Sequence, residues 1–148
     1  MEWTLGHKDP DNRGNRRYFT IASSPTENEI HLGVKIYQNP STFKENLLNM
    51  KKGDTIMASQ LAGDFILPSN KNQKLAFIAG GIGITPFRSM IKSLLDKQEK
   101  RSIVLFYSNK TVSEIAYKDI FDQAQTLGIK PVYVLTEKTL IPQDWKGS

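Results

Sequence analysis

The chain has 148 residues, of which 39% are hydrophobic and 24% charged, and its formal net charge is +5. This length allows one domain or two small half-domains. The absence of cysteine excludes disulfides, zinc–thiolate sites and iron–sulfur clusters ligated by this chain. It fits a reducing compartment, so we expect a cytoplasmic protein without a metal site. No apolar stretch approaches the ~20 residues of a membrane-spanning helix. The lysines are scattered, which disfavours a nucleic-acid partner.

The first half of the chain is predicted to be mostly antiparallel β-structure. Residues 8–15 form a turn-rich loop, and residues 30–37 alternate cleanly between apolar and polar side chains. The expected strands are 1–5, 17–23, 30–37 and 55–59, with a short helix over 42–50. This pattern favours part of a small β-barrel, which we assign to residues 1–70.

The second half changes character after the polar linker 68–74. Strands are predicted over 75–79, 102–107 and 131–135, with helices over 85–97 and 112–126. Thr111 and Glu114 have the spacing of a capping box for the second helix. Alternating strands and helices predict a parallel sheet with right-handed crossovers, so residues 71–148 are assigned to part of an α/β nucleotide-binding domain.

A glycine turn joins the first strand and helix of this second half. Gly80, Gly81 and Gly83 directly follow an apolar strand, and glycine permits positive φ and close approach of a ligand to the main chain. Thr85 is expected to cap the next helix, with Pro86 in its first turn. The free N–H groups of a helix N-terminus bind anions, so we expect a nucleotide pyrophosphate. A tight connection without a ligand is the alternative.

Three other groups of residues have the chemistry of a cofactor site. On the strand over 17–23, Arg17 and Phe19 face one side while Tyr18 and Thr20 face the other. These residues suit a flavin, although an ordinary strand would carry them too. Ser41 and Thr42, after Lys35, offer hydroxyls and N–H groups to a phosphate, or form a plain N-cap. Ser108, Asn109 and Lys110 are donors where an NAD-binding fold usually has an acid, which favours NADP over NAD.

Three motifs resemble the ferredoxin–NADP reductase-like flavoprotein reductases. They are RYFTIASSP, GDTIMASQLAGDFIL and AGGIGITPFRSM, in this order and covering nearly the whole chain. The resemblance implies a partial FAD-binding barrel followed by a partial NADP-binding domain. It also implies that further segments of both belong before residue 1 and after residue 148.

The resemblance assigns roles to the candidate residues. Arg17 would meet the FAD pyrophosphate, Phe19 would pack on the isoalloxazine in place of the usual tyrosine, and Thr20 would lie near N5 as the catalytic group. Tyr18 is a neighbouring candidate. The remaining cofactor contacts would be Lys35, Ser41 and Thr42 for FAD, and Gly80, Gly81, Gly83, Thr85, Pro86, Ser108 and Asn109 for NADP.

The implied function is passage of hydride from NAD(P)H to FAD and of electrons to an unidentified acceptor protein or domain. The alternative is a non-catalytic nucleotide- or flavin-binding module that needs a partner or missing segments for activity. Additional domains of a parent protein are expected under both hypotheses. Neither needs a metal ion or a general acid–base pair, because the flavin supplies the chemistry.

Overall fold

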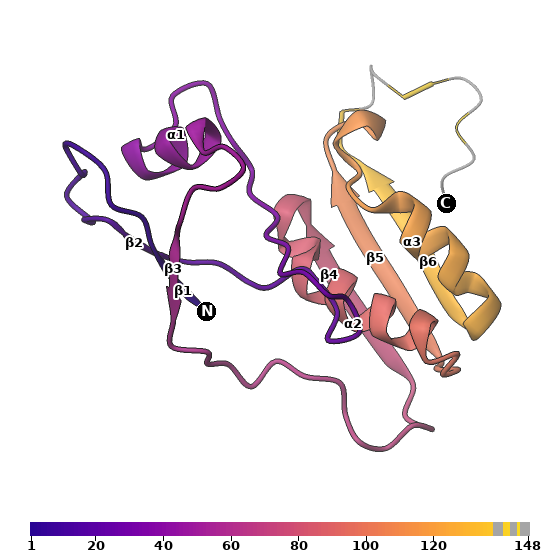
Figure 1. The fold of residues 1–148 in the computed structure, drawn as a ribbon. Helices are drawn as coiled ribbons and strands as arrows, with labels where there is room; N and C mark the ends of the chain where they lie inside the picture. Colours follow the sequence, from indigo (N-terminus) through magenta and orange to yellow (C-terminus); the bar gives the residue numbers. More distant parts are fainter. Residues whose placement is uncertain (138–140, 143–144, 146–148) are drawn as a thin grey trace. The chain divides into compact units, whose positions relative to one another are not determined.

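The computed structural model describes residues 1–137, 141–142 and 145, which form two compact units. The first unit contains Met1–Thr20 and Gly33–Asp64, and the second contains Ile21–Leu32 and the chain from Phe65 onward (Figure 1). The expected domains, residues 1–70 and 71–148, remain a prediction, because compactness within one structure does not define domain boundaries.

The first unit is built on a small antiparallel sheet. Its central strand β1 (Glu2–Thr4) pairs with β2 (Arg16–Tyr18) and with β3 (Met57–Ser59). Trp3 lies opposite both Arg17 and Ala58, so these three side chains share one face. The helix α1 (Thr42–Asn49) follows Ser41 and buries Phe43 completely. The antiparallel part of the predicted fold is confirmed.

Two predicted strands of the first half are wrong in extent. The strand predicted over 17–23 ends at Tyr18, and residues 30–37 do not form a strand. Only Ile21 and Leu32 pair, in a single antiparallel bridge. Alternation specifies which side chains could be buried, but a strand also needs a hydrogen-bonded neighbour along its length. Among the described residues, no such neighbour accompanies residues 33–37.

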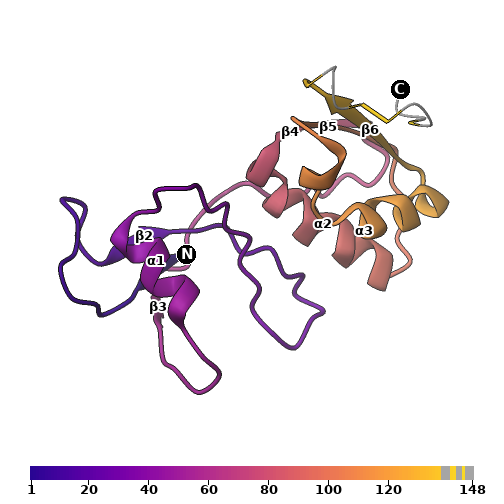
Figure 2. The ribbon, with the colours of Figure 1, turned by 90° about the horizontal axis from the view of Figure 1, so that it is seen from above.

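The second unit is a parallel sheet with helices on one face. The strands β4 (Leu75–Gly80), β5 (Ile103–Asn109) and β6 (Ile129–Leu135) lie in that order and run parallel. The helices α2 (Thr85–Asp96) and α3 (Lys118–Gln123) cover the same face of the sheet (Figure 2). The predicted parallel α/β arrangement is confirmed.

The core of this unit lies between the sheet and the two helices. Alternate residues of β5, Ile103, Leu105 and Tyr107, are buried against Ile91 of α2 and Phe121 of α3. The same alternation leaves apolar side chains exposed on the opposite face, among them Ile78, Phe106 and Val134. The core is therefore one-sided, as the single helical layer requires.

The helix predicted over 112–126 is broken into shorter pieces. Turns of 3-10 helix at Val112–Glu114 and Ala124–Leu127 flank the six-residue α3. Tyr117, just before α3, has φ of 59°, a left-handed conformation that an α-helix cannot continue through. The expected capping box also fails, because the Thr111 hydroxyl bonds to the hydroxyl of Ser113 at 2.9 Å instead.

Arg88 anchors residues 21–32 to α2. Its guanidinium donates to both carboxylate oxygens of Glu27, at 2.8 Å for one of them, and to the carbonyl of Ala22 at 3.1 Å. The neighbouring Ser89 hydroxyl donates to the carbonyl of Ser23 at 2.7 Å. Arg88 is 7% exposed, so the pair is shielded from water. The hydrogen bonds from Arg88 lower the pKa of Glu27 from 4.5 to about 2.

In the part of the chain that the structure describes, no helix combines the length and apolar character needed to cross a membrane.

The low pKa of Glu27 predicts a specific acid sensitivity. A carboxylate with a depressed folded pKa stabilises the fold above its unfolded pKa, near 4.5, and loses that contribution as the pH falls toward 2. We expect Glu27→Gln to lower the free energy of unfolding at pH 7 by roughly 3 kcal/mol and to flatten its fall between pH 5 and pH 2. Urea unfolding followed by circular dichroism at several pH values measures both effects.

Glu29→Gln is the matched control, because Glu29 lies in the same segment with its side chain 81% exposed. It should leave the acid dependence unchanged. A Glu27→Gln protein with the acid dependence of the wild type would contradict the anchoring role of the pair.

Candidate nucleotide and flavin sites

The glycine turn has the backbone geometry of an anion site. Residues Gly81–Ile84 form a 3-10 turn that leads directly into α2, and Gly81 has φ of +48°, in the left-handed region. Ile82 and Gly83 are exposed, whereas Ile84 and Thr85 are buried. The turn is therefore anchored by the buried side chains of Ile84 and Thr85, while Ile82 and Gly83 face solvent. The helical run begins with this turn, so the N–H groups at the start of the turn are those that lack intrahelical acceptors, which suits a phosphate.

The predicted cap of α2 is wrong. Thr85 belongs to the helix itself, and its hydroxyl donates to the carbonyl of Ile82 at 3.3 Å instead of accepting from the helix N-terminus. Pro86 lies in the first turn as expected. The main-chain N–H of Thr85 donates to the same Ile82 carbonyl, so the N–H groups left for a phosphate are those earlier in the turn.

Strand register brings the predicted nucleotide residues together. Gly80 of β4 lies directly opposite Ser108 of β5, and Asn109 ends β5 one residue later. The carboxyl ends of parallel strands are where α/β sheets bind ligands. Gly80, the turn and Ser108 therefore occupy the edge of the sheet that the sequence predicted for a dinucleotide.

Asn109 has a buried amide without a partner. Its side chain is 5% exposed, and neither the amide nitrogen nor the amide oxygen has a hydrogen-bond partner among the described residues. Its main-chain carbonyl accepts the N–H of Thr136 at 3.0 Å. An unpaired buried amide costs about 1–3 kcal/mol, so it is uncommon away from functional sites. The unpaired amide nitrogen and oxygen of Asn109 are therefore suited to hydrogen-bond a polar ligand or a water bound to that ligand.

The predicted flavin residues of the first unit also gather in one place. Phe19 and Arg17 both contact the ring of Phe43 on α1, with Phe19 at 6.0 Å between ring centroids and the Arg17 guanidinium at 5.2 Å. Thr42 precedes Phe43, and the hydroxyl of Ser41 accepts the N–H of Lys44 at 3.4 Å. Ser41 is therefore an N-cap, the alternative left open by the sequence.

Other predicted flavin residues lie outside this cluster. The carbonyl of Lys35 accepts the ammonium of Lys44 at 2.6 Å, which places its main chain beside α1. Tyr18 points to the opposite face of the sheet, where its hydroxyl donates to Gln60 at 2.9 Å. Thr20 is exposed at the last position of its segment. Strand alternation thus separates Tyr18 from Arg17 and Phe19, as predicted.

Comparison with known proteins identifies the family. Residues 77–148 match the model of the oxidoreductase NAD-binding domain. A flavohemoprotein of Candida albicans is 32% identical over 107 residues, which cover 72% of this chain and 26% of that protein. A ferredoxin–NADP+ reductase from Plasmodium falciparum superposes with a TM-score of 0.77 at 26% identity, over 93% of this chain and 56% of that one. The chain belongs to the ferredoxin–NADP reductase-like flavoprotein family.

The fold of this family member also matches more distant structures. A ferredoxin–NADP+ reductase from Neisseria gonorrhoeae, solved with bound FAD and NADP, gives a TM-score of 0.72 at 21% identity. That match covers 92% of this chain and 55% of the other. The chain spans about a quarter to a third of the length of the curated relatives that it matches first.

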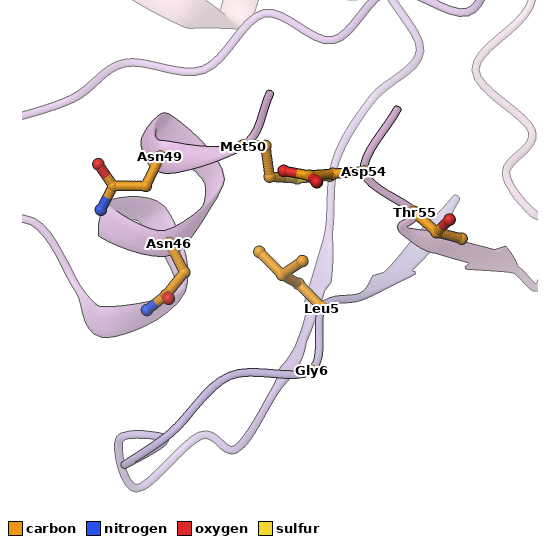
Figure 3. A pocket seen from close by; sticks show the side chains of 7 residues that line it. All are labelled: Leu5, Gly6, Asn46, Asn49, Met50, Asp54 and Thr55. Carbon is orange, nitrogen blue, oxygen red and sulfur yellow. The ribbon is translucent and has the colours of Figure 1, made fainter. Parts of the chain in front are cut away.

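Two hollows in this family member contain none of the predicted cofactor residues. One, of about 330 Å³, lies beside α1 in the first unit (Figure 3). Its lining residues are Leu5, Gly6, Asn46, Asn49, Met50, Asp54 and Thr55. The other, of about 530 Å³, includes Lys71, Lys100 and Gly128 and lies at the amino ends of the parallel strands, away from the glycine turn. No sequence motif marks either hollow.

The residue that sequence reasoning missed is Asp11. Its carboxylate accepts two hydrogen bonds from Arg17, at 2.7 and 2.8 Å, and its N–H donates to the hydroxyl of Thr42 at 3.2 Å. Burial alone would raise the pKa of Asp11, but hydrogen bonds from Arg13 and Arg17 hold that pKa below its usual value. Asp11 lies in a turn-rich loop, where an aspartate is too common to signal a site.

The orphaned amide of Asn109 predicts an unusual stability change. Asn109→Leu replaces an unsatisfied polar group by an apolar one of similar size, so we expect the ligand-free protein to gain about 1–3 kcal/mol in the free energy of unfolding. Urea unfolding checks this. The exposed Asn72→Leu should change it by less than about 0.5 kcal/mol. A loss of stability in Asn109→Leu would mean that the amide is satisfied in the protein.

Proposed function

We propose that the chain acts in a flavin-dependent oxidoreductase that passes hydride from NAD(P)H to FAD and electrons onward to an acceptor still to be identified. Family membership supports this class of reaction. The observation that carries the proposal is the buried amide of Asn109, which is unpaired among the described residues and lies one residue from the Gly80–Ser108 pair at the carboxyl edge of the sheet. This edge combines the N–H donors of the turn with a polar group that is unpaired among the described residues.

The nucleotide would be held by the second unit. The N–H groups of the turn containing Gly81 and Gly83 would bind the pyrophosphate, with Gly80 allowing close approach and Thr85 and Pro86 shaping the helix start. Ser108 and Asn109 would donate to the adenosine ribose or its 2′-phosphate. The absence of an acid from residues 108–113 supports NADP(H) over NAD(H).

The flavin would be held by the first unit. Arg17 would neutralise its phosphates, Phe19 would pack against its ring system, and the exposed hydroxyl of Thr20 would donate to a ring nitrogen. Ser41, Thr42, Lys35 and Tyr18 are the remaining proposed contacts. Bound flavin accepts hydride from a nicotinamide and releases electrons singly or in pairs. The role of the chain's own residues is binding, orientation and charge neutralisation.

A non-catalytic binding module is the second candidate. It is favoured by the pairing of Arg17 with Asp11, which occupies a proposed flavin contact. The two candidates differ in turnover. Absorption spectra of the protein with added FAD, followed by NADPH-dependent reduction of a dye, separate them. Flavin binding with reduction supports the enzyme, flavin binding without reduction supports the module, and no binding contradicts both flavin assignments.

Gly83→Ala tests the nucleotide turn most cleanly. Gly83 has ordinary φ, and a Cβ there would meet nothing within 4 Å, so the stability of the fold should not change. The added methyl would face the proposed pyrophosphate, and we expect NADPH affinity to fall at least about tenfold. Titration of NADPH fluorescence measures the affinity, and thermal unfolding checks the fold.

Gly6→Ala is the matched control, since Gly6 is equally unhindered but lies in the first unit. Gly81→Ala is less informative, because its positive φ alone would cost about 1 kcal/mol. Unchanged NADPH affinity in Gly83→Ala would show that the turn does not bind the nucleotide.

A further inference from the structure

The loop of residues 7–15 occupies the groups that the proposed function assigns to the flavin phosphates. One terminal nitrogen of Arg17 donates to both carboxylate oxygens of Asp11, at 2.7 and 2.8 Å. The other donates to main-chain carbonyls of the same loop and its end, at 3.2 Å for Arg13, 2.9 Å for Gly14 and 2.6 Å for Arg16. Both terminal nitrogens of the guanidinium are therefore engaged.

The same loop also engages Thr42 at the start of α1. The Thr42 hydroxyl accepts the N–H of Asp11 at 3.2 Å and lies 3.3 Å from Nε2 of His7. Arg17 and Thr42 come from distant parts of the sequence, and Asp11 bridges them. The ion pair is largely shielded from water, because the side chains of Arg17 and Asp11 are only 12% and 23% exposed.

A carboxylate and a phosphate make the same demand on these groups. Both are oxyanions that accept hydrogen bonds from a guanidinium. Because one terminal nitrogen of Arg17 donates to both oxygens of Asp11 and the other to main-chain carbonyls, a phosphate could bond to this guanidinium only by replacing these acceptors. A hydroxyl and a main-chain N–H are further groups that phosphates use. Asp11 thus holds the position and charge that a flavin phosphate would need beside Arg17 and Thr42.

We infer that Asp11 is an internal competitor for the flavin phosphate, and that the loop of residues 7–15 must release Arg17 before FAD binds. This inference rests on the proposed flavin site. The affinity for flavin then depends on replacing the Asp11 carboxylate by a flavin phosphate as the partner of Arg17. In the flavin-free protein the loop stays bound to Arg17, and only a flavin that carries a phosphate replaces it there.

Asp11→Asn tests the competition directly. The amide keeps the shape of the side chain and its main-chain N–H, but it removes the negative charge that holds Arg17. We expect the dissociation constant for FAD, measured by quenching of flavin fluorescence, to fall at least about tenfold. Asp11→Glu keeps the carboxylate and should stay close to the wild type.

Asp9→Asn is the matched control for charge. Asp9 is exposed in the same loop, and its positive φ of 54° is readily adopted by asparagine. It should not change FAD affinity. Riboflavin gives a second control, because it lacks phosphate and its affinity should be equal in the wild type and Asp11→Asn. Tighter riboflavin binding in Asp11→Asn would overturn the inference.

Trypsin cleavage after Lys8 and Arg13 reports the state of the loop without relying on affinity. We expect Asp11→Asn to be cleaved faster than Asp9→Asn without flavin, and saturating FAD to accelerate cleavage of the wild type. Slower or unchanged cleavage of the wild type with FAD would mean that the loop stays closed on the flavin, which contradicts the inference.

Arg17→Ala separates this inference from the proposed function. If Arg17→Ala binds FAD like the wild type, the flavin assignment of Arg17 fails and the competition fails with it. If Arg17→Ala loses FAD affinity while Asp11→Asn binds no tighter than Asp9→Asn, the flavin site stands and only the competition is wrong.

Discussion

The second unit depends on the pairing of one buried guanidinium. Arg88 bonds to Glu27 and to the carbonyl of Ala22, and it stacks 5.5 Å from the ring of Tyr117. A buried charge is tolerated only when it is paired, so these three partners must remain in place together. Arg88 thereby connects residues 21–32, α2 and the approach to α3, and Ser89 adds a second bond between the first two. Because Arg88 lies one turn from Thr85, the same helix carries both the anchor and the glycine turn.

Each unit contains an arginine–carboxylate pair, and the two pairs have different roles. Glu27 holds Arg88 inside a packed segment, and the hydrogen bonds from Arg88 lower the pKa of Glu27 because they favour its charged form. Asp11 holds Arg17 in a surface loop beside residues proposed here to contact flavin. The amide of Asn109 is the converse case, a buried polar group that finds no partner in the part of the chain that the structure describes. Unsatisfied or exchangeable polar groups are typical of sites that ligands complete.

Local signals predicted some elements well and others poorly. The apolar run before Gly80 and the Thr85-Pro86 helix start specified β4 and α2 to within a residue or two, because strand, turn and helix signals are contiguous there. The alternation over 30–37 was equally clear but formed no strand, since no neighbouring strand pairs with it. The helix predicted over 112–126 breaks at Tyr117, and no sequence pattern predicts the left-handed backbone conformation of that residue.

The sequence by itself determined the class of fold, the glycine turn and the residue types suited to flavin and nucleotide, because these follow from composition and short-range order. It also placed Ser108 near Gly80, since parallel strands share a carboxyl edge. Only the tertiary structure decided which partner each polar group has. Arg17 meets Asp11, the Thr85 hydroxyl turns to Ile82, and the Asn109 amide meets nothing in the described chain. The hydrogen-bond partner of a polar side chain depends on which distant segments approach it in space, and short-range sequence patterns do not predict that approach.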